Sequence, residues 1–381
     1  TRDVFMPNGS IPKVGDVLVQ KNLANTFYRM IEVERAASSK GREAAIGAVR
    51  DFFYKGDLAK EMVHFCQDQG GLLTMEDMSS FRVKLEPAQW GSYKGIDVAT
   101  CGPWCQGSLL IQFLHMLEGF DFQSMGYLSA DYIHTMLEVF KLAFSDRHHY
   151  YGDPEFVEVP IDGLMSKAFA KSRLAAIDHQ IANPEMPVPG NPWAFQSETP
   201  SVSTIARPTA TTGSLGEDTS YTCVVDRWGN VFSATPSDTF DATPIVPGLG
   251  FILSSRGSQS WLDPSHPSAL APGKRPRLTP NPALAFKNGR PWMPFGTPGG
   301  DIQCQAMAEM FVNIVEFGMD PQQAIEEPRF ATSSYPGSFW PHAYHPGLVT
   351  LEGRIDPSTV AELERRGHNV EIWDEWDVKA G

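Results

Sequence analysis

Helical spacing of apolar residues dominates the first part of the chain. Between residues 17 and 71 apolar positions recur every three or four residues, as on one face of a helix, and Gly70-Gly71 ends the pattern. β-branched and aromatic residues then predict two strands, at 82–85 and 96–100, around a turn at 91–95. We therefore expect a helical segment followed by a β-hairpin.

Two strongly apolar segments follow, and both predict helices. Residues 107–120 and 130–150 have wide apolar faces at helical spacing. In the second segment this face is formed by Ile133, Met136, Leu137, Val139, Phe140 and Phe144. Helices with such broad apolar faces are expected to pack against a sheet.

A long irregular segment precedes a second hairpin. Residues 181–217 are rich in Pro, Ser, Thr and Gly and have no hydrophobic period, which predicts an extended surface segment. Loops of this length inside a compact domain usually have a function or are disordered. Directly afterwards, residues 220–225 and 231–235 flank the turn 226–230 and predict a β-hairpin.

A glycine-rich turn, Gly296-Thr-Pro-Gly-Gly300, leads into an apolar helix predicted over 303–317. Such a turn exposes backbone N–H groups, and the helix dipole favours negative charge there, so the pattern predicts an anion or oxyanion site. The spacing matches neither the GxxxxGKS/T nor the GxGxxG phosphate motif. Farther on, Asp320-Pro321 and Asp356-Pro357 supply the N-cap and first residue of two more helices, and residues 369–373 suggest a final strand.

Composition and charge narrow the class of partner. The chain has 381 residues, 42% of them hydrophobic, which suits a packed globular protein. Its formal net charge of -14 gives no basic footprint for nucleic acid or an anionic membrane. No apolar run reaches about 18 residues, so no membrane span is expected. The net charge favours solubility, whereas the expectation of a small-molecule partner and of no cofactor rests on the family resemblance given below.

Metal and thiol chemistry are not favoured by the residue spacing. The cysteines are Cys66, Cys101, Cys105, Cys223 and Cys304. The CxxxC pair at 101 and 105 lacks the second ligand pair of a zinc motif, so ordinary buried or loop thiols are expected. His148 and His149 lie near Asp146 and Asp153, but adjacent helical residues point apart and do not chelate one ion. We predict no metal site.

Seven motifs occur in one order along the chain: VGDVLVQKNLANTF, GGLLTMEDM, KLAFSDRHHYYGDPEFVEVP, DTSYTCVVDRWGNVFSAT, APGKRPRLTPNPALAF, FGTPGG and EEPRF. Through them the chain resembles the gamma-glutamyltranspeptidase family of N-terminal-nucleophile (Ntn) hydrolases over nearly all its length. The resemblance implies an α+β fold, an αββα sandwich of two stacked antiparallel sheets flanked by helices. It also implies a precursor that cuts itself before a threonine, which becomes the nucleophile.

The resemblance assigns chemical roles to individual residues. The cleavage-site threonine falls on Thr219, so the cut is expected between Asp218 and Thr219. The Thr219 hydroxyl would attack an amide or acyl carbonyl, while its freed α-amine, with a pKa of about 8, would act as the base. Ser237 matches a second hydroxyl residue that hydrogen-bonds to the nucleophile. Gly299 and Gly300 match the backbone donors of the oxyanion hole.

Departures from the family pattern concern the substrate. Ser258 stands where γ-glutamyl-binding members have the aspartate that holds the α-amine, and Leu278-Thr279 replaces a serine pair that helps bind the α-carboxylate. The arginine used for that carboxylate belongs to a region upstream of residue 1. The segment around Arg256 resembles the acylase and amidohydrolase branch, where this arginine either contacts a substrate anion or is solvated or structural. A hydrolase or acylase of a non-γ-glutamyl substrate is therefore favoured over a glutathione-type transpeptidase, and the acceptor is either water or an amine.

The resemblance also implies a division of the chain. Residues 1–218, with 181–217 as an extended linker, would end the large chain, and 219–381 would form the small chain. Together they would make one Ntn-hydrolase domain, shortened at both ends, as a heterodimer from one precursor. Two other functions stay open: a true gamma-glutamyltransferase or glutathione hydrolase, and a non-catalytic binding or structural relative. Cys223 is a rival nucleophile, although a packed thiol is the simpler interpretation.

Overall fold

The computed structural model describes residues 1–7, 9–197, 205, 207–211, 219–238 and 243–377. The chain divides into two compact units, the first comprising residues 1–85 and 239–255, the second 86–238 and 256–381. Neither unit begins or ends at residue 219. A self-cleavage point need not coincide with the border of a folded unit, so the division into a large and a small chain stays a prediction.

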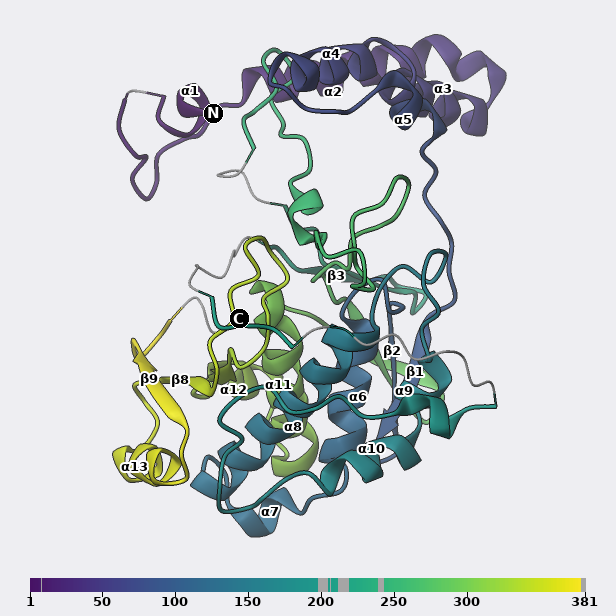
Figure 1. Cartoon of the computed structure of the whole chain (residues 1–381). Helices are drawn as coiled ribbons and strands as arrows, with labels where there is room; N and C mark the ends of the chain where they lie inside the picture. The colour runs from purple at the N-terminus through teal and green to yellow at the C-terminus, as the bar shows by residue number, and fades with distance from the viewer. Residues whose placement is uncertain (8, 198–204, 206, 212–218, 239–242, 378–381) are drawn as a thin grey trace. The chain divides into compact units, whose positions relative to one another are not determined.

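The first unit is built from successive helices, coloured purple to dark blue in Figure 1. The helical pattern predicted over residues 17–71 is divided among α2 (Lys21–Ala37), η1 (Ser38–Lys40), α3 (Arg42–Tyr54) and α4 (Asp57–Asp68). Two short helices that were not predicted, α1 (Arg2–Phe5) and α5 (Met75–Ser80), flank it. A small core joins α4 to the returning segment through Leu58, Met62, Val246 and Leu249. The Thr26 hydroxyl of α2 donates a 2.9 Å hydrogen bond to the Leu249 carbonyl, which ties a second helix to the same segment.

The first hairpin corrects a sequence prediction. Residues 82–85 form no strand, and Val83 and Leu85 are exposed. The strand is instead β1 (Gln89–Tyr93), which pairs with β2 (Ile96–Thr100) around a tight turn. Gly91, expected in the turn, lies inside β1, where an added Cβ would meet Ile111 at 2.3 Å. This glycine therefore permits close packing of a helix on the strand.

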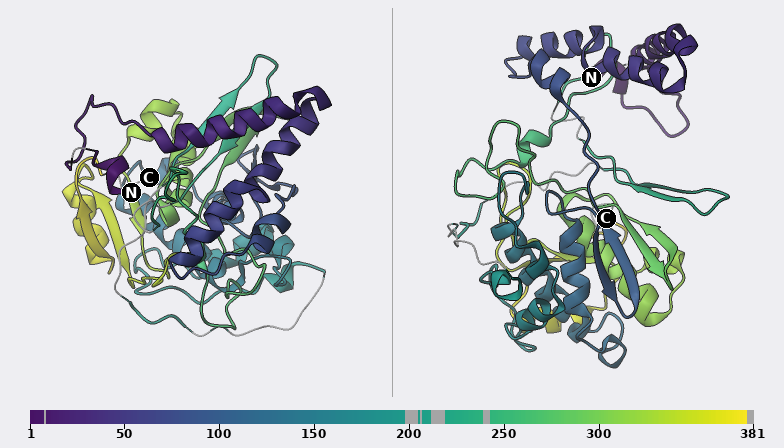
Figure 2. Two further views of the ribbon diagram at one scale, coloured as in Figure 1. Left: turned by 90° about the horizontal axis from the view of Figure 1, so that it is seen from above. Right: turned by 90° about the vertical axis from the view of Figure 1, so that its right-hand side faces the viewer.

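A four-stranded antiparallel sheet in the order β1-β2-β5-β6 forms the centre of the second unit. Its other strands are β5 (Ala283–Lys287) and β6 (Arg290–Phe295). Helix α6 (Gly107–Leu117) packs on β1 and β2, and all of its residues are buried. In the right-hand view of Figure 2 the helices of this unit stand to one side of the sheet. The predicted helix 107–120 is thus confirmed, with its end at Leu117.

Helix α8 (Ala130–Tyr150) has the bounds that the sequence predicted. The Ser129 hydroxyl accepts a hydrogen bond from the N–H of Tyr132, which caps the helix start. One side of α8 packs on α6, and the helix also carries buried charges. Each is paired, as burial of a charge requires: Glu138 with Lys141, Asp146 with Arg173, and Arg147 with Asp301.

The C-terminal part continues with α11 (Gln303–Phe317), α12 (Pro321–Glu326) and α13 (Pro357–Arg365). Asp320 and Asp356 accept hydrogen bonds from the N–H groups of Gln323 and Ser358, which confirms both predicted N-caps. A smaller sheet has the order β7 (Phe330–Thr332), β8 (Leu348–Glu352) and β9 (Asn369–Trp373). β7 and β8 are antiparallel, whereas β8 and β9 are parallel because α13 carries the chain back between them.

Short elements complete the second unit: α7 (Phe122–Met125), α9 (Ile161–Leu164), α10 (Lys167–Leu174), η2 (Pro192–Phe195), η3 (Arg256–Gln259) and η4 (Gly300–Ile302). Within the described part of segment 181–217, η2 is the one helical element, so the segment is largely irregular as predicted. It is not a pure surface segment, because Met186 and Trp193 are buried in the main core. The second hairpin consists of β3 (Thr222–Val225) and β4 (Val231–Ala234). Cys223 is exposed on β3, so the expectation of a packed thiol there is wrong. Among the described residues, no helix combines the length and apolarity that crossing a bilayer requires.

Candidate functional site

The β3–β4 hairpin brings Thr219 and Ser237 together. Thr222 pairs with Ala234, and the N–H of Ser220 donates to the Pro236 carbonyl at 2.9 Å, which continues the same register. Extended by one more residue on each side, this register sets Thr219 opposite Ser237. Their hydroxyl oxygens lie 2.7 Å apart in a hydrogen bond, and Thr219 is half-buried. Two of the predicted site residues therefore meet, whereas Asp218 lies outside the described residues.

Arg256 contacts both Ser237 and Thr279. Its Nε donates to the Ser237 carbonyl at 3.1 Å, and its Nη2 donates to the Ser237 hydroxyl. Its Nη1 donates to the Thr279 hydroxyl at 3.3 Å. The side chain is only 7% exposed and its guanidinium faces the ring of Phe339, so Arg256 is not a solvated surface residue. The positively charged guanidinium thus donates directly to the Ser237 hydroxyl, which is itself hydrogen-bonded to Thr219.

Thr279 and Ser258, both predicted to contact substrate, have different surroundings. Thr279 is fully buried, and its hydroxyl also accepts from the Gln259 side chain at 3.3 Å. Ser258 is exposed, and its carbonyl accepts from the N–H of Trp340 at 2.8 Å. No hydrogen bond within the described residues joins its side chain to Thr219 or Thr279. Thr279 is therefore hydrogen-bonded to Arg256 in the interior, whereas Ser258 lies at the surface.

Gly299 and Gly300 form a buried turn before α11. Their φ angles are 113° and 55°, in the left-handed region that favours glycine. Neither N–H finds a hydrogen-bond acceptor among the described residues, although both residues are buried. Buried amides normally have a partner, so two amides without one at the start of a helix suit a ligand oxygen carrying negative charge.

The glycine turn and the hairpin are neighbours. β4 packs against β5 and β6, and the turn follows directly after β6. A Cβ on Gly296 would lie 2.5 Å from the ring of Tyr221, two residues after Thr219. Only glycine at position 296 allows the two segments to approach so closely.

Sequence reasoning missed three residues that support this turn. Gln106, which precedes α6, donates from Nε2 to the carbonyls of Thr279 at 3.0 Å and Gly300 at 3.1 Å. Its Oε1 accepts from Arg147 at 2.7 Å, and Arg147 pairs with Asp301. Arg147 lies within the KLAFSDRHHYYGDPEFVEVP motif, and Asp301 directly follows the FGTPGG motif, so family motifs pointed to both regions. Gln106 carried no local signal.

The histidines singled out from the sequence do not form a metal site. The ring of His148 is buried against the rings of Trp261 and His266, while His149 contacts Tyr150. Burial and nearby positive charge, chiefly burial, lower the pKa of His148 well below its ordinary value. This ring is therefore a neutral member of an aromatic cluster, and the two histidines diverge as expected for adjacent helical positions.

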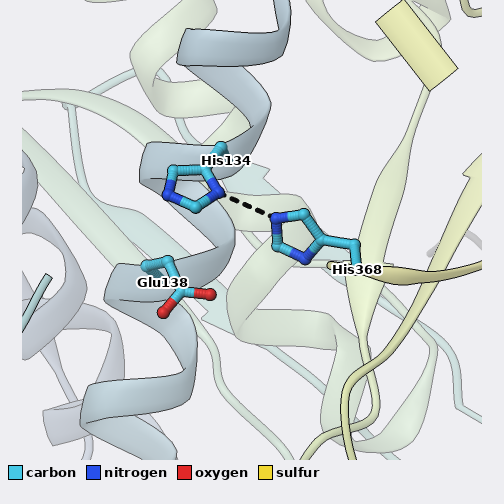
Figure 3. Close-up of side chains that lie close together, drawn as sticks. All are labelled: His134, Glu138 and His368. Carbon is cyan, nitrogen blue, oxygen red and sulfur yellow. Dashed lines mark hydrogen bonds between the residues drawn. The ribbon is translucent and has the colours of Figure 1, made fainter. Parts of the chain in front are cut away.

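One other group of metal-ligating side chains occurs among the described residues: His134, Glu138 and His368 (Figure 3). His134 Nε2 bonds to the Asp178 carbonyl at 2.8 Å, and its Nδ1 bonds to His368 Nε2 at 2.9 Å. Glu138 accepts from Lys141 at 2.7 Å and from the side chain of Asn183. Because Lys141 already balances the charge of Glu138, a divalent ion would add two uncompensated buried charges. We assign this group to structural hydrogen bonding.

Comparison with known proteins agrees with the sequence motifs. A family model described as Gamma-glutamyltranspeptidase matches residues 1–380. The chain is 33% identical over 336 residues to the glutathione hydrolase proenzyme of Bacillus subtilis strain 168, which covers 87% of this chain and 54% of that protein. The chain thus spans about half the length of this relative.

Solved structures also match the fold. A structure of LmbA2991HD superposes with a TM-score of 0.85 at 36% identity, covering 98% of this chain and 66% of that one. The cephalosporin acylase from Bacillus halodurans matches with a TM-score of 0.78 at 28% identity, covering 100% of this chain and 60% of the acylase. These likenesses confirm the α+β Ntn-hydrolase fold that the sequence predicted.

Removing the Ser237 hydroxyl should slow the predicted self-cleavage before Thr219. Losing one hydrogen bond to an oxygen that gains negative charge costs about 1.5–3 kcal/mol, so Ser237→Ala should lower the rate by roughly 10- to 100-fold. Ser233→Ala is the matched control, because its hydroxyl bonds to Tyr221 on the same hairpin at 2.9 Å. Cleavage is followed by intact-mass analysis. Equal rates for the two variants would contradict a specific role of Ser237.

Proposed function

Because the chain belongs to the gamma-glutamyltranspeptidase family, we propose that it cuts itself before Thr219 and then cleaves amide bonds through an acyl-enzyme on that residue. The observation that carries the proposal is the 2.7 Å hydrogen bond between the hydroxyls of Thr219 and Ser237, at the position that the hairpin register requires. The buried, acceptor-free amides of the neighbouring glycine turn support it.

The proposed chemistry begins with the cut. Before cleavage the Thr219 nitrogen is an amide that cannot accept a proton, whereas the new α-amine, with a pKa of about 8, can. This amine takes the proton of the Thr219 hydroxyl as Oγ1 attacks the substrate carbonyl carbon. The carbonyl oxygen gains the negative charge and accepts hydrogen bonds from the N–H groups of Gly299 and Gly300. One such donor is worth about 2.7–4 kcal/mol in other acyl-transfer enzymes.

The tetrahedral intermediate then collapses. The bond from the carbonyl carbon to the leaving nitrogen breaks, and the protonated α-amine of Thr219 gives its proton to that nitrogen. An ester on Oγ1 remains. Water then attacks the ester carbon while the same α-amine takes one of its protons. The bond from the carbonyl carbon to Oγ1 breaks, the carboxylic acid leaves, and the α-ammonium group returns the proton to Oγ1. An amine in place of water gives transfer of the acyl group.

Ser237 and Arg256 assist the nucleophile in this proposal. As Thr219 loses its proton, the Ser237 hydroxyl can donate to Oγ1 and stabilise the charge there. Arg256 donates to the Ser237 oxygen and polarises its O–H bond, because hydrogen bonds in a chain strengthen one another. The three guanidinium nitrogens of Arg256 all bond to Ser237 or Thr279, which favours this role over a direct contact with a substrate anion.

The proposed substrate is an amide whose acyl group lacks the γ-glutamyl α-amine. Position 258 is an exposed serine and supplies no carboxylate for an ammonium group. Thr279 is buried and bonded to Arg256 and Gln259. A match to a protein named cephalosporin acylase fits this preference. The match to a glutathione hydrolase proenzyme favours the alternative, a γ-glutamyl substrate.

The proposed nucleophile is tested by self-cleavage. Purified full-length chain, incubated and analysed by denaturing gel and intact mass, should give one piece ending at Asp218 and one beginning at Thr219. Thr219→Ala should stay uncut, because no hydroxyl can attack the preceding carbonyl. Thr222→Ala and Cys223→Ala, on the same strand, should cleave normally. A wild-type chain that stays intact as long as Thr219→Ala would support the non-catalytic alternative.

Substrate preference is tested with two anilides that differ only by the α-amine. Glutaryl-p-nitroanilide should have a kcat/KM at least about tenfold above that of γ-glutamyl-p-nitroanilide, since no carboxylate offsets desolvation of the ammonium group. Ser258→Asp should narrow this ratio by restoring a carboxylate, whereas Ser260→Asp serves as the control. Faster turnover of the γ-glutamyl compound by the wild type would overturn the acylase preference and leave the threonine mechanism standing.

A further inference from the structure

Gln106 joins two parts of the candidate site through one buried amide group. The side chain is fully buried, and Nε2 donates to the Thr279 carbonyl at 3.0 Å and to the Gly300 carbonyl at 3.1 Å. Thr279 bonds to Arg256, so this amide spans from the Arg256 group to the glycine turn. Both amide hydrogens of Gln106 are used in this bridge.

The orientation of this amide is fixed by charge. Oε1 of Gln106 accepts from Nη1 of Arg147 at 2.7 Å. If the amide were flipped, its N–H groups would face the guanidinium and its oxygen would face two carbonyls. That arrangement loses three hydrogen bonds and places like partial charges together. Arg147 therefore keeps both donors of Gln106 directed at Thr279 and Gly300.

Arg147 is itself held by Asp301, the residue after Gly300. The two side chains form a buried ion pair, and Asp301 also accepts from the N–H of Ser338 at 2.7 Å and from its hydroxyl at 2.6 Å. Burial alone would raise the pKa of Asp301, but Arg147 and Ser338 outweigh it and hold the pKa below its ordinary value. The carboxylate is therefore charged, and the segment after the glycine turn is anchored at two points.

We propose that Gln106 is a positioning residue that aims the backbone donors of the glycine turn for the reaction at Thr219. The inference rests on the proposed function. Glycine at positive φ has no side chain to restrict its rotation, so Gly299 and Gly300 need external contacts to keep their N–H groups in one direction. The N–H of Gly300 shares a peptide group with the Gly299 carbonyl, which accepts from the Ile302 N–H at 2.9 Å. Gln106 holds the next peptide group at the Gly300 carbonyl, so both peptide groups that flank Gly300 are fixed, and the Arg147–Asp301 pair anchors the residue that follows. A misplacement of about 1 Å can cost about 100-fold in rate.

The test compares two buried glutamines in full-length, self-cleaved protein. Gln106→Met keeps the volume and removes both donors. Gln305→Met is the matched control, because Gln305 is also fully buried and donates to the Thr332 carbonyl at 3.2 Å and the Tyr335 hydroxyl at 3.1 Å. Glutaryl- and γ-glutamyl-p-nitroanilide are the probes, and kcat and KM are measured separately alongside the thermal midpoint.

Gln106→Met should lower kcat by about 100-fold and change KM by less than about threefold, because the donors act on the transition state and not on the bound substrate. Gln305→Met should keep kcat within about threefold at a similar loss of thermal midpoint. If Gln106→Met does not fold, Gln106→Glu replaces it. The carboxylate still accepts from Arg147 but cannot donate when ionised, so the same loss of kcat is expected.

Failure of the positioning role of Gln106 and failure of the proposed function give different results. A folded Gln106 variant that keeps kcat within threefold of wild type, or a Gln305 variant that loses as much, would overturn the positioning role alone. Absence of Thr219-dependent turnover of either anilide by the wild type would overturn the proposed function, and the inference with it.

Discussion

The register of the β3–β4 hairpin is the constraint on which the candidate site depends. Because side chains alternate along a strand and partners are fixed across it, the pairing of Thr222 with Ala234 determines what faces Thr219. A slip of one residue would replace Ser237 with a neighbour and turn the Thr219 hydroxyl to the other face. The turn that sets this register is held by Asp226, whose carboxylate accepts from the N–H groups of Trp228 and Asn230 at 2.9 Å.

Hydrogen bonds extend from this pair into the interior of the second unit. They run from Thr219 through Ser237 and Arg256 to Thr279, and from there through Gln106 to the glycine turn. The buried Arg147–Asp301 pair completes the set behind the turn. Two buried arginines are costly to desolvate, and each has several acceptors that offset the cost. We infer that the desolvation cost of these arginines is tolerated because the polar network fixes one arrangement of the site, which an apolar core would not specify.

Local patterns predicted the elements that local chemistry determines. The Asp-Pro pairs at 320 and 356 cap helices because the aspartate and proline act within one turn, and 130–150 forms a helix because its apolar period is continuous. The prediction of a strand at 82–85 was wrong, because β-forming residue types give a strand only where another strand is available to pair with it. The turn position predicted for Gly91 was wrong, because the role of this glycine is close packing against Ile111 of α6, which lies 20 residues later in the chain.

The residues of the candidate site also differ in how far the sequence predicted them. Thr219, Ser237, Gly299 and Gly300 were identified through family motifs, and the roles assigned to them stay predictions. Gln106 was not predicted as a site residue, because its acceptors lie 173 and 194 residues away and no local spacing encodes such contacts. The ambiguity over Arg256 was of another kind: an isolated arginine gives the same sequence signal whether solvated or buried. Burial and the contacts to Ser237 and Thr279 distinguish the two.

If Thr219 carries the acyl group, as we propose, the ester on its Oγ1 can be trapped and located. Self-cleaved protein is mixed with an excess of glutaryl p-nitrophenyl ester, quenched in acid within the first turnover, digested and mapped by tandem mass spectrometry. We expect one glutaryl group on the peptide that begins at Thr219, located on the threonine and absent when the enzyme is given time to hydrolyse it. A glutaryl group on Cys223, or no labelled peptide while nitrophenol is released, would contradict it.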